Sequence, residues 1–179
     1  MSLIIEDGTG VADADSFLTL VNARTLALNY GLTLATDDTE AEVQLRQGYN
    51  GLLVSEPTLQ GARTHSIQTG IYPRTGVYSN CQSVDSESIP NSVKLAQLNY
   101  ASAINGGYKL NAIDNGQDVK SFTVPGAYQK VYQDGSSIKA NSTIQGVDNA
   151  LYPLTLQGYA NSPCGRANGA GGLVREEFF

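Results

Sequence analysis

The sequence has no tryptophan, one histidine, one methionine and two cysteines among its 179 residues. It also has no excess of cationic side chains, since 17 acidic residues outnumber 11 basic ones and the net charge is −6. Nucleic-acid-binding proteins use Lys and Arg to neutralise phosphates, so this balance argues against that class. No run of about 18 apolar residues occurs, so we predict no transmembrane segment and no membrane partner.

Candidate catalytic and metal-binding residues are few. His65 is the only histidine, and a general base needs positioned partners. Asp7, Asp13 and Asp15 lack the ligand spacing of a calcium-binding EF-hand loop, so helix capping is the favoured interpretation. No nucleophile elbow, phosphate-cradling loop or zinc motif is present. We therefore expect no catalytic residue, no metal and no cofactor, and a protein that is not an enzyme.

The two cysteines, Cys81 and Cys164, do not have the spacing of metal ligands. A disulfide between residues this far apart cannot be assigned from sequence alone, because it depends on their distance in the fold. Two free thiols in a reducing cytoplasm are the expected state. Whether the cysteines ever pair is left open by the sequence.

Hydrophobic periodicity predicts a helical core over about residues 15–107. Its first helix would follow a cap at Asp15 or Ser16, the second would begin near Asp37, and Pro90 would start the third. A long polar connection, residues 55–88, separates the last two. Gly48 and Gly51 cost about 1 kcal/mol each in a helix, which indicates close packing against another helix.

The pattern changes after residue 118. Two apolar runs around Pro125 and Gly126 predict a small β element over about residues 118–140. A short amphipathic helix is predicted over about residues 143–152. Residues 158–179 are rich in Gly, Asn and Ala and lack periodicity, so they predict an extended C-terminal tail beyond a domain that spans residues 1–157.

Aromatic side chains at four positions are able to stack on nucleic-acid bases, namely Tyr72, Tyr78, Tyr128 and Tyr132. Stacking without a basic groove makes a poor single-strand binder, which favours core or interface packing for these tyrosines. The basic residues are spread over different predicted elements, as shown by Arg46, Arg63, Arg74 and Lys94.

Three segments resemble a phage protein family when taken in order. Residues 5–10 with residues 12–17 are similar to the opening of proteins labelled DnaT-like single-stranded DNA-binding proteins. Residues 72–77 resemble the family's signature, although the family more often has Trp at the position of Tyr72. Ile89-Pro90 and the residues behind it resemble the family's third helix, and no match extends past residue 110.

Such proteins resemble the head–tail adaptors, or head-completion proteins, of tailed bacteriophages. The resemblance implies a mainly α fold, a small helical bundle with a β-hairpin insertion and an extended C-terminal tail. It implies a structural virion protein that assembles as a ring, a dodecamer, between the portal protein and a tail or nozzle protein. Double-stranded DNA would pass through the lumen without sequence-specific binding. The expected location is the head–tail interface of the virion, and the host cytoplasm during assembly.

The resemblance also suggests which residues make contacts. The tail would dock on the portal, with the terminal residues Arg175, Phe178 and Phe179 as its anchors. The signature would serve either as a subunit interface or as a structural turn, through Tyr72, Pro73, Arg74 and Gly76. The alternative function is that of a single-stranded DNA-binding, DnaT-like replication accessory protein, which the negative charge and the scattered basic residues disfavour.

Overall fold

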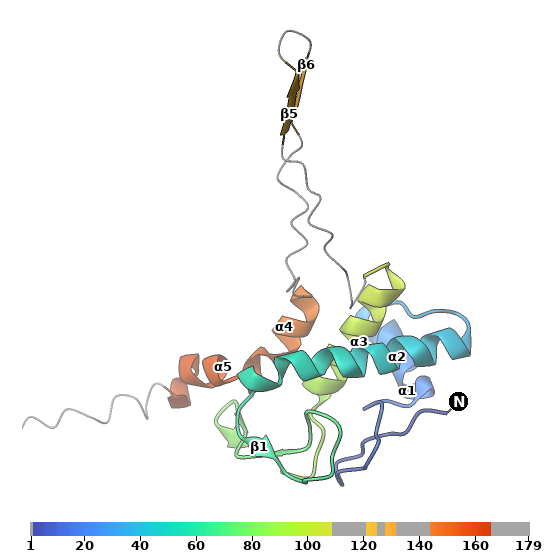
Figure 1. Ribbon diagram of the computed structural model, residues 1–179. Coiled ribbons are helices and arrows are strands. Elements are labelled where there is room, and N and C mark those ends of the chain that lie inside the picture. Colours follow the sequence, from blue (N-terminus) through green and yellow to red (C-terminus); the bar gives the residue numbers. More distant parts are fainter. Residues whose placement is uncertain (1, 109–120, 125–127, 132–143, 166–179) are drawn as a thin grey trace, which may run out of the picture. The chain divides into compact units, whose positions relative to one another are not determined.

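The structure of the protein is a computed structural model that describes residues 2–108, 121–124, 128–131 and 144–165 (Figure 1). The chain divides into two units, residues 1–108 together with 144–179, and residues 109–143. The described elements are mostly helices, joined by short two-stranded antiparallel sheets. This confirms the predicted mainly α fold with a β-hairpin. None of the described helices has the length and apolar character needed to cross a membrane.

Two long helices form the centre of the larger unit. Helix α2 (Asp38–Leu52) and helix α3 (Asn91–Asn105) pack along each other. A Cβ atom at Gly48 would lie 2.7 Å from the carbonyl oxygen of Gln97, so only glycine allows this approach. The expectation that Gly48 marks close helix packing is therefore confirmed. The Asp37 carboxylate caps α2 by accepting a hydrogen bond from the Glu40 amide at 3.0 Å, as its sequence predicts.

The first helix begins later than the sequence predicts. Helix α1 covers Leu20–Tyr30, and the hydroxyl of Thr19 caps it by accepting a hydrogen bond from the Asn22 amide. Asp15 and Ser16 do not cap it, because the Asp15 carboxylate instead accepts a hydrogen bond from the Ile4 amide at 2.7 Å. Helix α1 therefore follows a separate buried segment, residues 14–18.

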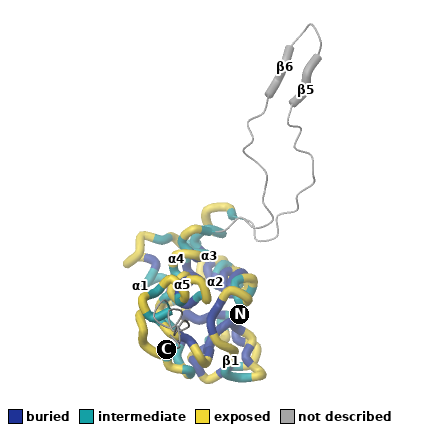
Figure 2. Tube along the Cα trace, turned by 90° about the vertical axis from the view of Figure 1, so that its left-hand side faces the viewer, coloured by how far each residue is buried: buried dark blue, intermediate teal, exposed yellow. Residues whose placement is uncertain are grey.

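The side chain of Gln97 joins three parts of this unit. It is fully buried, and its amide oxygen accepts a hydrogen bond from the Phe17 amide at 2.9 Å. Its amide nitrogen donates to the Ser16 hydroxyl and to the Leu45 carbonyl, each at 2.9 Å. A buried amide is favourable only when both ends are paired, and here the pairing holds the N-terminal segment against α2 and α3. Buried residues gather around these elements in Figure 2.

The connection between α2 and α3 is ordered by short elements rather than by a long helix or sheet. It starts with a 3-10 helix, η1 (Leu53–Thr58). Two small antiparallel pairs follow, namely β1 (Ala62–Arg63) with β2 (Arg74–Thr75), and β3 (Tyr78–Ser79) with β4 (Gln82–Ser83). Asn80 and Cys81 both have positive φ, 49° and 67°, in the two-residue turn between β3 and β4, as a type I′ hairpin requires.

The last described segment of the larger unit contains helix α4 (Gln145–Leu151), the 3-10 helix η2 (Tyr152–Leu154) and helix α5 (Leu156–Asn161). Helix α4 lies within the short helix that the sequence predicts. Helix α5 corrects the predicted tail boundary, because it continues across residue 158. Thr155 caps α5 through a hydrogen bond from the Gly158 amide at 2.9 Å. The Gly-rich composition after residue 158 concealed this six-residue helix.

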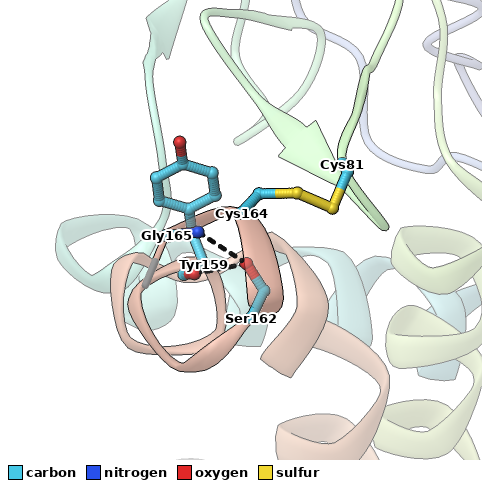
Figure 3. The surroundings of a disulfide bond; sticks show 5 residues. All are labelled: Cys81, Tyr159, Ser162, Cys164 and Gly165. Carbon is cyan, nitrogen blue, oxygen red and sulfur yellow. Dashed lines mark hydrogen bonds between the residues drawn. A yellow bond between two sulfur atoms is a disulfide. The ribbon is translucent and has the colours of Figure 1, made fainter. Parts of the chain in front are cut away.

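A disulfide joins Cys81, in the β3–β4 turn, to Cys164, just after α5 (Figure 3). Their Cα atoms are 5.6 Å apart although 83 residues separate them in sequence, and this distance suits a disulfide. The expectation of two free thiols is wrong. The cause is a tertiary contact between the β3–β4 turn and the end of α5, which neither local sequence predicts.

The smaller unit contains the predicted β element. Strands β5 (Ser121–Val124) and β6 (Tyr128–Val131) form an antiparallel hairpin. The register pairs Ser121 with Val131, Phe122 with Lys130, Thr123 with Gln129 and Val124 with Tyr128.

Candidate functional site

Most of the signature segment, residues 72–77, is buried in the folded core. Tyr72 has 0% of its surface exposed, and burial raises the pKa of its phenol. The Tyr72–Pro73 peptide bond is cis, and Gly76 has a φ of 75°. A positive φ of this size is unfavourable for residues with a Cβ atom. The segment therefore runs from the buried ring of Tyr72 through strand β2 to a turn at Gly76.

Arg74 directs its guanidinium group into its own chain. Only 5% of the residue is exposed. Its Nε donates a hydrogen bond to the Gln60 carbonyl and its Nη2 to the Gly61 carbonyl, both at 2.8 Å. Its Nη1 contacts the Ile71 carbonyl at 3.3 Å and the Glu56 carboxylate at 3.2 Å. Of the two predicted roles, these contacts correspond to the structural turn.

Glu56 links two arginines of the connection. Its carboxylate accepts hydrogen bonds from Nε and Nη2 of Arg63 and from Nη1 of Arg74. The hydrogen bonds from Arg63, followed by its charge and by the contacts from Arg74, hold the pKa of Glu56 below its ordinary value of 4.5. Both arginines thus share one carboxylate of the same chain, and the three groups together carry a net charge of +1.

This pKa shift leads to a pH-dependent expectation. A carboxylate with a lowered pKa in the folded state stabilises the fold fully above its unfolded pKa, and this stabilisation is lost as the pH falls through the folded pKa. We expect the melting temperature of Glu56→Gln to be lower than that of the wild type at pH 7. The difference should shrink below about pH 4.5. A constant difference from pH 7 to pH 3 in thermal melts would contradict this role.

The other residues named from the sequence have local roles or lie outside the described residues. The Asp7 carboxylate accepts hydrogen bonds from the amide and hydroxyl of Thr9, and Asp15 pairs with Arg46, so neither caps a helix. The ring of His65 packs against Gly10. Within the residues that the structure describes, no group of three or more His, Cys, Asp or Glu is arranged to hold a metal ion. Arg175, Phe178 and Phe179 lie outside the described residues.

Arginines of the larger unit are engaged by acidic side chains. Arg24 pairs with Asp38 at 2.7 Å, and Arg46 with Asp15 at 2.6 Å. Arg63 and Arg74 share Glu56, as described above. Among the lysines and arginines of residues 2–108 and 144–165, only Lys94 lacks an ion pair with a described carboxylate. The described part of the larger unit therefore has no cluster of cations without carboxylate partners.

The charge of the segment that contains the hairpin is different. Residues 109–143 hold four of the five lysines in the chain and three aspartates, which gives a net charge of +1. The rest of the chain therefore has a net charge of −7. The lysines of this segment are Lys109, Lys120, Lys130 and Lys139. The composition of the whole chain conceals this local excess of cations.

The register of the hairpin places aromatic and cationic residues together. Directly opposed residues of an antiparallel pair lie on the same face, and residues two apart share a face. Phe122 is paired with Lys130, and Val124 with Tyr128, so all four residues are on one face. We call the three residues Phe122, Tyr128 and Lys130 the aromatic–lysine face. Aromatic rings can stack on planar groups, and an ammonium group can neutralise an anion.

Sequence reasoning considered Tyr128 but missed Phe122 and Lys130. It considered the charge of the whole chain and the scatter of Arg46, Arg63, Arg74 and Lys94 over different elements, and did not count the lysines of residues 109–143. The local count over residues 109–143, together with the alternation of the two predicted strands, was the signal that would have found them.

Comparison with known proteins gives one family. A family model described as "Putative DnaT-like ssDNA binding protein" matches residues 1–170. No curated protein and no solved structure matches significantly.

The match corrects the main functional interpretation of the sequence. The assignment as a virion head–tail adaptor is wrong, and so is the expectation of a dodecameric ring with portal and tail partners. The family description corresponds to the alternative instead. The error arose because the charge of the whole chain was weighed against the label carried by the resembling proteins. Since the match covers nearly the whole chain, this protein belongs to the DnaT-like ssDNA binding protein family.

Proposed function

We propose that the protein binds single-stranded DNA through the aromatic–lysine face of the β5–β6 hairpin. The observation that carries the proposal is the hairpin register, which places Phe122, Tyr128 and Lys130 on one face. The family description supports the same ligand. Single-strand binders without sequence preference combine stacked aromatic side chains with cations along the backbone, and this face contains both.

The negative charge of the whole protein does not oppose this function. At physiological ionic strength, charges separated by more than about 8 Å are largely screened from each other. The charge of the protein close to the bound DNA strand therefore matters more for binding than the net charge of −6 of the whole chain. In residues 109–143 that local charge is +1, with aromatic residues between the lysines. The described arginines of the larger unit would gain little from a phosphate, because each already contacts a carboxylate, which Arg63 and Arg74 share.

Binding should depend on Lys130 and on salt. For single strands, the logarithm of the binding constant falls with the logarithm of salt concentration by about 0.7 per neutralised phosphate. With four lysines in the segment, we expect a slope no steeper than about −3. Lys130→Gln should weaken binding of fluorescein-labelled oligo(dT) and reduce the slope by about 0.7. Fluorescence anisotropy at several salt concentrations measures both quantities.

Lys94→Gln is the matched control, because Lys94 is a lysine of helix α3 in the other unit. It should leave affinity and slope unchanged. Phe122→Leu should weaken binding without changing the slope, because it removes a stacking ring and no charge. Equal effects of Lys94→Gln and Lys130→Gln, or an absence of oligo(dT) binding at low salt, would overturn the proposal.

We also infer that the protein acts by binding rather than by catalysis. Its only histidine packs against Gly10, and the Nε2 atom of His65 has no hydrogen-bond partner among the described residues. A general base needs a positioned partner and access to substrate.

A further inference from the structure

A cleft of about 220 Å³ lies in the larger unit, where the β3–β4 hairpin meets η2 and α5. Three tyrosines from these three elements line it, namely Tyr78, Tyr152 and Tyr159. Asn80 and Ser162 add polar groups, and Cys81 of the disulfide completes one side. The lining contains no carboxylate, ammonium or guanidinium group. The cleft is therefore neutral and aromatic, in a protein whose net charge is −6.

Two of the tyrosine rings are available to a ligand. Tyr78 is 45% exposed and Tyr152 is 44% exposed. The rings of Tyr78 and Tyr159 already contact each other, with centroids 5.9 Å apart and a tilt of 39°. A planar ligand would not enter between these two rings. It would stack on an outer face, supported from behind by the ring contact.

The walls of the cleft are held by a buried glutamine. Gln60 is 3% exposed, and its side-chain oxygen accepts a hydrogen bond from the Tyr78 amide at 3.0 Å. Its side-chain nitrogen donates to the carbonyls of Tyr78, Pro153 and Thr155. One side chain thus fixes strand β3 relative to the η2–α5 segment. Such preorganisation reduces the entropic cost of binding.

Gly158 and the disulfide fix the remaining wall. A Cβ atom at Gly158 would clash with the carbonyl of Tyr152, so glycine lets α5 pack closely on η2. The disulfide joins Cys81 in the β3–β4 turn to Cys164 beyond α5, next to Tyr159 and Ser162 (Figure 3). The Ser162 hydroxyl donates to the Tyr159 carbonyl and accepts a hydrogen bond from the Gly165 amide. These hydrogen bonds hold the turn that follows α5 in place beside the cleft.

From these features we infer that the cleft is a binding site for a single nucleobase, a second contact for the single-stranded DNA of the proposed function on which this inference rests. Each base of a single strand has a neutral planar face that stacks on tyrosine. The volume of about 220 Å³ is below the usual range of about 300–1,000 Å³ for sites of drug-sized ligands, and so suits one ring system. The neutral lining favours a base over a phosphate, because a phosphate requires a cation or a set of amide donors.

The probe for this site is the free nucleoside 2-aminopurine deoxyriboside, whose fluorescence is quenched by stacking. We expect the oxidised full-length protein to quench it, and thymidine to compete. Tyr78→Leu and Tyr152→Leu keep apolar bulk at half-exposed positions but remove the rings. Each should weaken nucleoside binding at least about fivefold. Tyr78→Phe, which keeps the ring, should bind the nucleoside as the wild type does. Tyr30→Leu is the control, since Tyr30 is 58% exposed on helix α1.

The two proposals fail in different ways. Lys130→Gln should leave nucleoside quenching unchanged while weakening oligo(dT) binding. Equal quenching by the wild type and by both leucine variants, with oligo(dT) still bound, would overturn the cleft alone. Nucleoside quenching without any oligo(dT) binding would support a nucleobase site in the cleft, but would overturn both the proposed function and the role of the cleft as a contact for single-stranded DNA. Stronger competition by N-acetyltyrosinamide than by thymidine would assign the cleft to a peptide side chain and overturn this inference.

Discussion

Reduction of the Cys81–Cys164 disulfide is expected to lower the free energy of unfolding by about 4 kcal/mol. The bond closes a loop across 83 residues, and in the chain-entropy model the stabilisation grows with the logarithm of loop length. This is a large share of the roughly 5–15 kcal/mol by which domains are stable. Urea unfolding followed by circular dichroism, with and without a phosphine reductant, measures the loss.

The double substitution Cys81→Ser/Cys164→Ser is the control for this experiment. It should unfold at the same urea concentration as the reduced wild type and should not respond to the reductant. Identical midpoints for oxidised and reduced wild-type protein would show that the bond contributes no stability. The sequence pattern gives no such expectation, because it does not place the two cysteines near each other.

Arg74→Ala is expected to cost about 3–5 kcal/mol of stability, because three carbonyl groups lose a charged donor and a buried group without its partner costs about 1–3 kcal/mol. The substitution removes the hydrogen bonds that Arg74 donates to the carbonyls of Gln60, Gly61 and Ile71. The Glu56 carboxylate keeps its ion pair with Arg63. Urea or thermal unfolding of the purified variant measures this effect.

Arg24→Ala is the matched control, because Arg24 also pairs with a carboxylate, that of Asp38, but its side chain is 35% exposed and that of Asp38 is 77% exposed. Exposed ion pairs contribute about 1 kcal/mol or less. Arg74→Lys should recover little of the stability, because lysine keeps the charge and loses the planar group that reaches several carbonyls. Equal stability of the Arg24 and Arg74 alanine variants would refute the structural role of Arg74.

Local signals in the sequence were sufficient for most of the helices. The Asp37 cap, the start of α3 at Pro90 and the strands on either side of Pro125 and Gly126 depend on residues close in sequence, so they were predictable. The start of α1 was not. Asp15 is as good a cap as Thr19, and only the tertiary contacts of Asp15 with Ile4 and Arg46 decide between them.

Contacts between segments distant in the sequence could not be predicted from the sequence pattern. Gln60 and Arg74 appear as ordinary polar residues of a long connection. Their burial follows from carbonyl groups of Gly61, Ile71, Pro153 and Thr155 that the fold brings to them. The tyrosine cleft was missed for the same reason, since its rings come from residues 78, 152 and 159. The hairpin face was predictable in principle from alternation and from a local charge count.

The disulfide also changes the covalent topology of the chain. The backbone from residue 81 to residue 164 and the bond between its ends form a closed circuit, and residues 109–143 belong to it. A single proteolytic cut within that circuit opens it without separating the pieces. The cleaved protein should therefore migrate as one species on a non-reducing gel and as two once a thiol is added. After a cut within the β5–β6 hairpin, its two halves would therefore remain parts of one covalent molecule, held together through the disulfide.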